Sequence, residues 1–555
     1  MLTKKITALL SCLLLCHSIA SPHSDPRSEN TLSAQDSLLL RDYRYVQQSS
    51  PWLTQRNAAA LVRGLYNHES IAETELSFTH ASGKLTDVSG SPSVNNLQAG
   101  IESYYRISPR AVVLGGISYD NFSGSDMTGS VFMQQRLPFD IIEDSLTNSG
   151  RKHRDTYQLT GAFSYSFSPK LSIGLRMDYT AGNYAKYKDL RHKNKLMDLQ
   201  FTAGVLSTFN LQHSTFNVGA DYTYHRRTES LGFNTYGKSD KVYKSLIDYG
   251  AMMGIVEQFG NEGYTDKNNE MPLFEDGHGG DIQLELCPLS SLSIFGNIGF
   301  IHATGYYGSK SPYTITYTDH ERDIFAEQVR ISYEQRTWKA LLDIRYQHEK
   351  LQNHTNTVRG LTNNYGATHY EYYDDAETGD KKWRNLDIDY TMYLGIRHEL
   401  PTWTLTAGYH WQQRDLTAYL YPYYRQQQLR TSELTASVAR NILLSKGIWN
   451  ITAKGGYQKG SGDIYTDGTF VTPTGKQTQP ATMEALLWRD YQYLTAPQYS
   501  IGMQVKYTFL FPGTKLCTHI RAVFDYRRAS ITDETPSGFH NPQRTTFTIA
   551  AGHTF

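Results

Sequence analysis

Apolar and polar side chains alternate along many segments of about ten residues. The clearest is residues 402–412, where Trp403, Leu405, Ala407, Tyr409 and Trp411 share one face and polar residues or glycine share the other. Strand side chains alternate with a period of two, so the pattern predicts a strand with one apolar face. Aromatic rings stand at both ends of that face with aliphatic residues between them. A lipid-facing strand needs this order, because aromatic rings settle at the two headgroup levels.

The same alternation recurs in residues 157–167, 171–180, 499–509 and 544–555. Each segment is close to the ten or so residues that a tilted strand needs to cross a bilayer. Short turns such as 168–170 and 335–337 alternate with longer polar stretches, which we interpret as loops. The main predicted loops are 182–195, 227–280, 349–385, 416–430 and 460–497.

This arrangement predicts an all-β fold, a transmembrane antiparallel up-and-down β-barrel of about 18 strands (16–20) with short periplasmic turns and long extracellular loops. Residues 248–259 are compatible with a further hairpin or a loop helix, which leaves the strand count open by two. The barrel is predicted to span residues 71–555. Residues 21–70 form an extension, periplasmic or luminal, in which Asn57 is positioned to cap a helical turn.

The N-terminus reads as a secretory signal peptide over residues 1–20. Lys4 and Lys5 precede an apolar stretch, and Ser18-Ile19-Ala20 fits the small-x-small rule for cleavage after Ala20. A lipoprotein reading at Cys12 or Cys16 is the weaker alternative.

Composition excludes several classes of protein. Lys+Arg and Asp+Glu are both 54, so there is no bulk charge for nucleic-acid binding. The low mean hydropathy of −0.51 does not argue against a barrel, because alternating strands average to a soluble-looking value. No later run of eighteen apolar residues predicts a transmembrane helix. Two cysteines, Cys287 and Cys517, follow the predicted signal peptide and make no disulfide framework.

The final strand shows Phe547, Ile549, Ala551, His553 and Phe555 on one face. This ending resembles the closing strand of bacterial outer-membrane barrels, in which a terminal Phe is part of the insertion signal. His553 departs from the bulky apolar residue usual there. The resemblance implies that the barrel-assembly machinery is a partner through the C-terminal strand.

Over residues 40–555 the architecture, the Tyr-rich loops and the terminal Phe resemble large single-domain outer-membrane barrels of Bacteroidetes, including families of unknown function. The resemblance implies the Gram-negative cell outer membrane and contact with its lipid and lipopolysaccharide. Residues 21–70 are too short for the plug domain of TonB-dependent transporters. The basic stretch 186–195 has two readings, pairing with lipopolysaccharide phosphates and a plain solvated loop.

Charged side chains of both signs fall on the predicted inward faces. One interpretation is a water-filled pore whose selectivity they set, and the other is a lattice of ion pairs. The pore candidates are Glu102, Arg106, Arg176, Asp178, Asp221, Glu285, Arg330, Asp343, Arg345, Asp387, Asp389, Arg397, Lys506, Arg521, Asp525 and Arg527. The predicted lipid-interface girdle is Trp338, Trp403, Trp411, Trp449, Tyr179, Tyr409, Tyr507 and Phe555.

The sequence contains no catalytic signature. A Gly-x-Ser-x-Gly elbow, a His-Glu-x-x-His motif and a phosphate loop are all missing, so no enzyme activity and no catalytic residue is predicted. His410, His519 and His225 are the candidates for a dispersed hydrolase site, although a lumen histidine is more often a polar lining residue. The acidic stretches 275–281 and 373–377 are explained by turn chemistry, so neither a metal site nor a cofactor is predicted.

The leading functional hypothesis is a channel or binding barrel for a polar solute, with the external loops as a gate. The alternative is a structural or docking barrel for lipoprotein or secretion partners. An outer-membrane lipid hydrolase is the third hypothesis.

Overall fold

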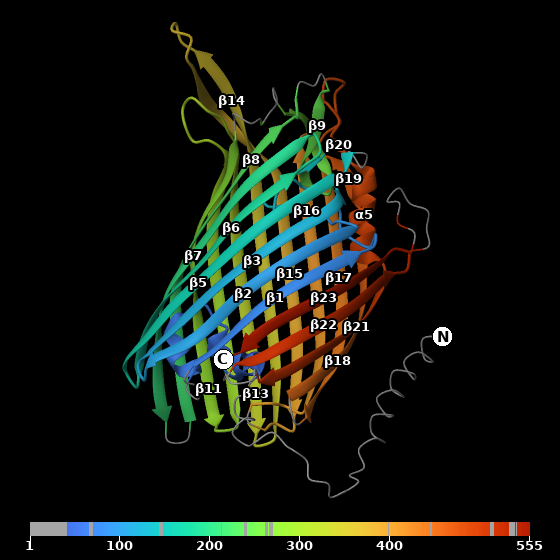
Figure 1. Ribbon diagram of the computed structural model, residues 1–555. Helices are drawn as coiled ribbons and strands as arrows, with labels where there is room; N and C mark the ends of the chain where they lie inside the picture. The colour runs from blue at the N-terminus through green and yellow to red at the C-terminus, as the bar shows by residue number, and fades with distance from the viewer. Residues whose placement is uncertain are drawn as a thin grey trace, which may run out of the picture.

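The computed structural model describes residues 42–554, except 66–69, 144–147, 212–213, 238–240, 261–264, 266–269, 398, 445–446, 511–515, 532–538 and 540. The predicted signal peptide and Phe555 lie outside the described residues. Eighteen long strands form one closed antiparallel barrel (Figure 1). The first and last strands pair from Glu73 opposite Thr554 to Ser82 opposite Thr545, which closes the cylinder and leaves no edge. The predicted fold class is confirmed.

The barrel strands follow one another around the wall in chain order. They are β1 (Ser70–Ser82), β2 (Ser93–Ser108), β3 (Ala111–Met127), β5 (Gly150–Ser168), β6 (Leu171–Lys186), β7 (Arg191–Leu211), β8 (Ser214–Asn234), β11 (Met271–Leu289), β12 (Leu292–Gly308), β13 (Thr316–Gln335), β14 (Trp338–Thr362), β15 (Thr368–Leu394), β16 (Trp403–Leu420), β17 (Tyr423–Leu444), β18 (Gly447–Gly462), β21 (Gln498–Leu510), β22 (Cys517–Ala529) and β23 (Gln543–Thr554). The short strand β19 (Thr466–Thr469) adds to the outer end of β17.

The outward face of the wall carries an apolar belt. Large aliphatic and aromatic side chains there are 40–62 % exposed, among them Leu76, Phe78, Ile117, Phe163, Ile282, Ile298, Ile501, Met503 and Ile549. Water-soluble monomers rarely expose a contiguous apolar surface of this kind. On β23 the outward Ile549 is half exposed, whereas Ala550 on the opposite face is 2 % exposed, as the alternation predicts.

Several strands run further than the alternation indicates. The predicted loops 182–195 and 416–430 are mostly strand, because β6 and β7 leave four residues between them and β16 and β17 leave two. β14 and β15 pair out to Thr362 opposite Thr368, so most of the predicted loop 349–385 is a hairpin that projects beyond the barrel (Figure 1). Above the apolar belt the outward positions turn polar, as Lys193 and Lys195 do. The sequence alternation therefore ends there while backbone pairing continues.

Three of the long connections meet in a second, four-stranded sheet. It comprises β4 (Asp140–Glu143), β9 (Tyr243–Gly250), β10 (Met253–Phe259) and β20 (Ala481–Thr482). The further hairpin predicted within 248–259 exists as β9–β10, but it belongs to this sheet and leaves the wall at 18 strands. The helix α5 (Glu484–Thr495) follows β20. We call residues 128–143, 243–259 and 481–495 the outer lid.

The outer lid packs against the inner face of the wall near the long-loop end. Phe132, Phe139 and Tyr249 of the lid share one buried core with Leu231 of β8 and Tyr307 of β12. Phe139 meets Tyr307 edge to face, with ring centroids 5.2 Å apart. Burial of these side chains fixes the lid inside the barrel mouth rather than above it.

Residues 42–65 lie inside the wall and form the inner plug. Its elements are α3 (Tyr43–Ser49), η1 (Pro51–Leu53), η2 (Ala58–Ala60) and α4 (Leu61–Gly64). Asp42 accepts hydrogen bonds from the backbone N–H groups of Arg44 and Tyr45 and so caps α3. Among the residues that the structure describes, no helix combines the length and the apolar character needed to cross a membrane.

Candidate functional site

The inner plug is held in the lumen by Asn57, which is fully buried. Its side-chain oxygen accepts a hydrogen bond from the N–H of Ala59, which confirms the predicted cap. Its Nδ2 donates to the carbonyl oxygens of Val205 and Ala220 at 3.2 and 3.3 Å and to Oε1 of Gln283 at 3.0 Å. One amide therefore joins the plug to three neighbouring strands of the wall.

Glycines in the wall make room for the inner plug. A Cβ on Gly174 would lie 2.1 Å from the backbone nitrogen of Ala59, and a Cβ on Gly204 would lie 2.1 Å from Oδ1 of Asn57. No side chain larger than hydrogen fits at either position while the plug is present. By contrast, a Cβ on Gly161, on the outward face of β5, would meet nothing within 4 Å.

Charged wall residues complete the binding of the inner plug. Glu285 accepts from Nε1 of Trp52 at 2.6 Å and from Nδ2 of Asn217 at 2.8 Å. Arg106 donates to the carbonyl oxygens of Val62 and Leu65, both at 2.9 Å. Glu285 and Arg106 were both predicted to line a pore, and both instead bind the inner plug.

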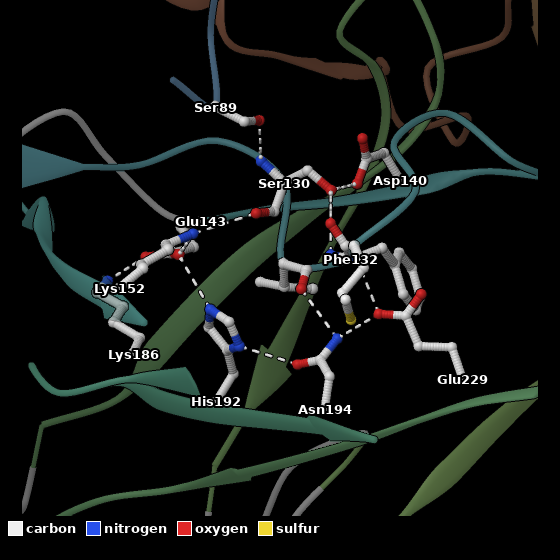
Figure 2. Close-up of polar contacts among 12 residues, drawn as sticks. Ser89, Ser130, Phe132, Asp140, Glu143, Lys152, Lys186, His192, Asn194 and Glu229 are labelled. Carbon is white, nitrogen blue, oxygen red and sulfur yellow. Dashed lines mark hydrogen bonds and ion pairs between the residues drawn. The ribbon is translucent and has the colours of Figure 1, made fainter. Parts of the chain in front are cut away.

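The outer lid is fastened to the wall by a buried ionic cluster, shown in Figure 2. Glu143 of the lid pairs with Lys152 of β5 at 2.5 Å and also with Lys186 of β6, and the ends of both lysine side chains are inaccessible to solvent. Nearby, Asn194 of β7 donates to Glu229 of β8 at 2.6 Å and to the backbone oxygen of Val131 in the lid at 3.0 Å. We call the Glu143–Lys152–Lys186 group the lid latch.

A second charged group fixes α5. Asp490 pairs with Arg136 of the lid at 2.8 Å and with Arg414 of β16 at 2.5 Å. Burial alone would raise the pKa of Asp490, but the two guanidinium groups hold that pKa below its usual value. The carboxylate therefore stays ionised and links two parts of the lid to the wall.

A cavity of about 940 Å³, here called the chamber, lies between the inner plug and the outer lid. Gln55 and Arg56 of the plug contribute to one side, and Tyr493 and Leu494 of α5 contribute to another. The rest of its lining comes from inward residues of the wall, most of them polar. Its volume falls at the upper end of the range of about 300–1,000 Å³ usual for ligand sites.

Comparison with protein families gives one match over most of the chain. The family described as "Family of unknown function (DUF6850)" matches residues 59–555. The chain belongs to this family. No curated protein matches the chain.

The solved structures to which the chain is similar include three receptors. The siderophore receptor PiuA from Acinetobacter baumannii is 8 % identical, with a TM-score of 0.42 over 88 % of this chain and 82 % of the receptor. The ferric preacinetobactin receptor BauA from the same organism is 8 % identical, with a TM-score of 0.41 over 88 % and 80 %. The ferric-catecholate import receptor Fiu from E. coli K12 is 11 % identical, with a TM-score of 0.38 over 87 % and 82 %. At these values the likeness carries no inference about a ligand.

In this family member, fifteen of the sixteen predicted pore residues lie on inward positions of wall strands. Many are paired with another side chain. The pairs include Arg176 with Asp178, Arg330 with Asp343, Arg345 with Asp389, Arg521 with Glu75, Asp525 with Lys454, Arg527 with Glu433 and Asp221 with Gln283. Glu102 accepts a hydrogen bond from Gln47 of the plug, Asp387 accepts one from His410, and Lys506 lies opposite Arg521.

Arg397 departs from the prediction that it lines the lumen. It lies beyond the end of β15, is exposed, and its backbone pairs with Leu400 in a turn. The prediction assumed that the alternation of β15 continues to Arg397, but this strand ends at Leu394. The acidic stretches 275–281 and 373–377 are also corrected, because they lie within β11 and β15 rather than in loops.

The predicted girdle residues in the described part of the chain face outward. Trp338 and Trp403 are the first residues of β14 and β16, and Trp449 is close to the start of β18. All three therefore stand at the short-turn end of the barrel. Trp449 contacts Tyr507 with ring centroids 4.7 Å apart, and Arg440 lies 4.8 Å from the ring of Trp403. Trp411, Tyr409 and Tyr179 lie at outward register positions of β16 and β6.

The three candidate histidines each meet a carboxylate. Nδ1 of His410 is 2.8 Å from Asp387, Nε2 of His225 is 3.0 Å from Asp198, and Nε2 of His519 is 3.2 Å from Glu75. Each pair joins two strands of the wall. The three histidines come from β16, β8 and β22 and are not brought together into one site.

Sequence reasoning missed the uncharged residues of the chamber. The chamber is lined by Gln347, Asn385 and Gln412, which are uncharged and so were not among the predicted pore residues. The same period-two alternation could have predicted them, because Gln347 follows the inward Arg345 by two residues and Asn385 precedes the inward Asp387 by two. The lid helix α5 was also missed, because residues 460–497 were interpreted as a polar loop.

The lid contains a group that titrates near neutral pH. Burial raises the pKa of Asp140 in β4 to about 7, and the nearby Asp248 carboxylate also raises it. The hydrogen bond from Ser130 and the positive charges of Arg136 and Lys381 lower the pKa, but by less. A raised pKa means that the docked lid favours the protonated acid. This stabilisation is complete below the ordinary value of 3.8 and is lost as the pH rises through about 7.

We therefore expect the lid to open more readily at about pH 8 than at about pH 5. Hydrogen exchange of residues 128–143, corrected for the intrinsic pH dependence of exchange, measures this opening. The variant Asp140→Asn should reduce the pH dependence. Equal protection of the native chain at both pH values would contradict the assignment.

Proposed function

We propose that this chain is an outer-membrane barrel that binds a polar solute in the chamber and passes it across the membrane. The inner plug and the outer lid are the closing elements on its two sides. The observation that carries the proposal is the chamber itself, a polar cavity of about 940 Å³ between two separately fastened segments within one apolar-belted barrel.

The outer-membrane location rests on the surface of the wall. An exposed apolar belt with tryptophans at its short-turn end fits a bilayer, and a closed barrel leaves no backbone group unpaired in lipid. Lipopolysaccharide contact and assembly through β23 follow from this location as further proposals.

We propose transport or binding rather than catalysis. His410, His225 and His519 are each explained by a carboxylate partner in the wall, and they lie on strands that do not converge. The charges of the lumen support the same proposal, since paired charges give a polar surface that hydrates a passing solute.

Displacing the inner plug should open a path for ions. In Gly174→Val the new side chain overlaps Ala59, so the plug cannot bind in its present position. We expect a several-fold higher mean conductance in planar bilayers than for the native chain, because each transient opening of the outer lid then completes the path, whereas in the native chain the plug must leave as well.

The matched control is Gly161→Val. Gly161 lies three positions before Ser164, whose hydroxyl donates to the plug at Ala59, but its own Cβ would point away from the lumen into open space. Its conductance should equal that of the native chain. The proposal fails if Gly174→Val folds into a barrel whose conductance is also unchanged.

A docking role is a second candidate, favoured by the projecting β14–β15 hairpin. Tyr365 at its tip is 96 % exposed, and Tyr373 is 58 % exposed. Exposed tyrosines of this kind are enriched in protein interfaces. Gentle detergent extraction followed by mass spectrometry should recover a stoichiometric partner that is lost when residues 360–370 are replaced by a short turn. Recovery of the barrel alone would argue against docking.

A further inference from the structure

Four adjacent strands present a row of uncharged polar side chains to the chamber. Gln347 of β14 lies opposite Asn385 of β15, Asn385 opposite Gln412 of β16, and Gln412 opposite Thr431 of β17. All four line the chamber. Residues directly opposite in an antiparallel pair share one face, so the four side chains form a single row across the wall, here called the amide row.

The amide groups of this row have no partner among the residues that the structure describes. In the part of the chain that the structure describes, the side chains of Gln347, Asn385 and Gln412 make no hydrogen bond, and Gln412 is exposed to the chamber. Each offers two donors and an acceptor. Other chamber amides differ, because Gln55 donates to Gln328 at 2.8 Å and Gln328 donates to Asp343 at 2.8 Å.

The charges beside the amide row are matched. In the neighbouring row, Arg345 pairs with Asp389 at 2.5 Å, and Asp387 pairs with His410 at 2.8 Å. Glu433 pairs with Arg527 at 3.1 Å. A charged ligand would have to separate one of these pairs, whereas a neutral ligand leaves them intact. The local electrostatics therefore favour an uncharged solute.

An aromatic ring stands next to the amide row. Trp383 lies two residues before Asn385, on the same face of β15, and is half-buried. It lines a smaller cavity of about 130 Å³ that Gln412 and Thr431 share with the chamber. Asp87 and the ion-paired Arg136, Arg414 and Asp490 line the same small cavity. Within the described residues its ring contacts no other aromatic ring. An indole face of this kind is available to the apolar C–H face of a ligand.

We infer that the amide row and Trp383 bind a neutral saccharide. Strands lie about 4.8 Å apart, so the row offers amides at regular intervals to a ligand with hydrogen-bonding groups along its length. Sugar hydroxyls donate and accept, as amides do, and the C–H face of a pyranose ring stacks on indole. A free peptide fits less well, because the charges next to the row, on Arg345, Asp387 and Glu433, are already paired. The inference rests on the proposed function.

The test uses the full-length protein in detergent on an array that carries neutral oligosaccharides, uronic and sulfated oligosaccharides, and peptides. We expect capture by neutral oligosaccharides. The double variant Asn385→Leu with Gln412→Leu should bind about tenfold more weakly, the loss expected for two hydrogen bonds of ordinary strength. Trp383→Ala should also weaken capture, and Trp383→Phe should retain most of it.

The matched control is Gln504→Leu, an inward amide of β21 outside the chamber lining, which should bind like the native chain. Folding of each variant is checked by its heat-dependent mobility on gels. The inference is overturned if only acidic oligosaccharides or peptides are captured, if nothing is captured, or if the double variant binds as the native chain does.

This experiment fails independently of the proposed function. If Gly174→Val conducts ions but no oligosaccharide binds, transport stands and the ligand class is wrong. If oligosaccharides bind but Gly174→Val does not conduct, the ligand class stands and passage through the lumen is wrong.

Discussion

Glu143→Leu is expected to undock the outer lid at a cost of about 3–5 kcal/mol, the usual result of removing one partner from a buried ion pair. Glu143 is the carboxylate that faces both Lys152 and Lys186, and the ends of both lysine side chains are shielded from water. Without it the two ammonium groups repel each other in a medium of low polarity. Release of residues 128–143 would let water reach both lysines.

Limited proteolysis measures this release, because a protease cleaves residues 128–143 only when they leave the wall. We expect cleavage of Glu143→Leu under conditions that leave the native lid intact. The matched control combines Glu143→Leu with Lys152→Met and Lys186→Met, which removes all three charges and should restore protection. If the single variant is as resistant as the native chain, the latch does not hold the lid.

Ala407→Lys is expected to destabilise the barrel by about 2–4 kcal/mol, as charged substitutions do at the middle of a lipid-facing strand. Ala407 is exposed on the outward face of β16, midway between Trp403 and Trp411. Reversible urea unfolding in lipid vesicles measures the change in the free energy of unfolding.

The control is Thr404→Lys on the same strand. Thr404 lies opposite Tyr393 on the inward face, where a lysine reaches the polar lumen, so we expect a much smaller change. Equal costs for the two variants would mean that the assignment of inward and outward faces is wrong.

The wall of the barrel could be predicted because lipid imposes a simple rule on it. Every second residue faces the membrane, so Trp403 to Trp411 and the last strand reveal their faces directly in the sequence. The rule loses force at the strand ends, which explains the misplaced Arg397 and the underestimated lengths of β6, β7, β14 and β15.

The lid and the inner plug could not be predicted in the same way. Their stability depends on partners far away in the sequence, such as Asn57 with Gln283 or Asp490 with Arg136. The cap at Asn57 was visible as a local motif, but its position in the lumen was not. The need for glycine at Gly174 and Gly204 becomes clear only from the position of the plug, which leaves no space for a Cβ atom there.

Some predictions stay predictions. They are the signal peptide, the Bacteroidetes origin, the partners and the role of the charged residues in selectivity. The amide row shows why the charged residues were an incomplete guide to the lumen. Its three amides also face the chamber, and within the described residues they make no hydrogen bond, whereas charged neighbours such as Arg345 are paired.

The most direct test of passage through the lumen is the ion current through a planar bilayer that contains the variant combining Glu143→Leu with Gly174→Val. With the lid latch broken and the plug position blocked, we expect stable conductance steps larger than those of either single variant. A folded, inserted double variant that passes no current would contradict passage through the lumen.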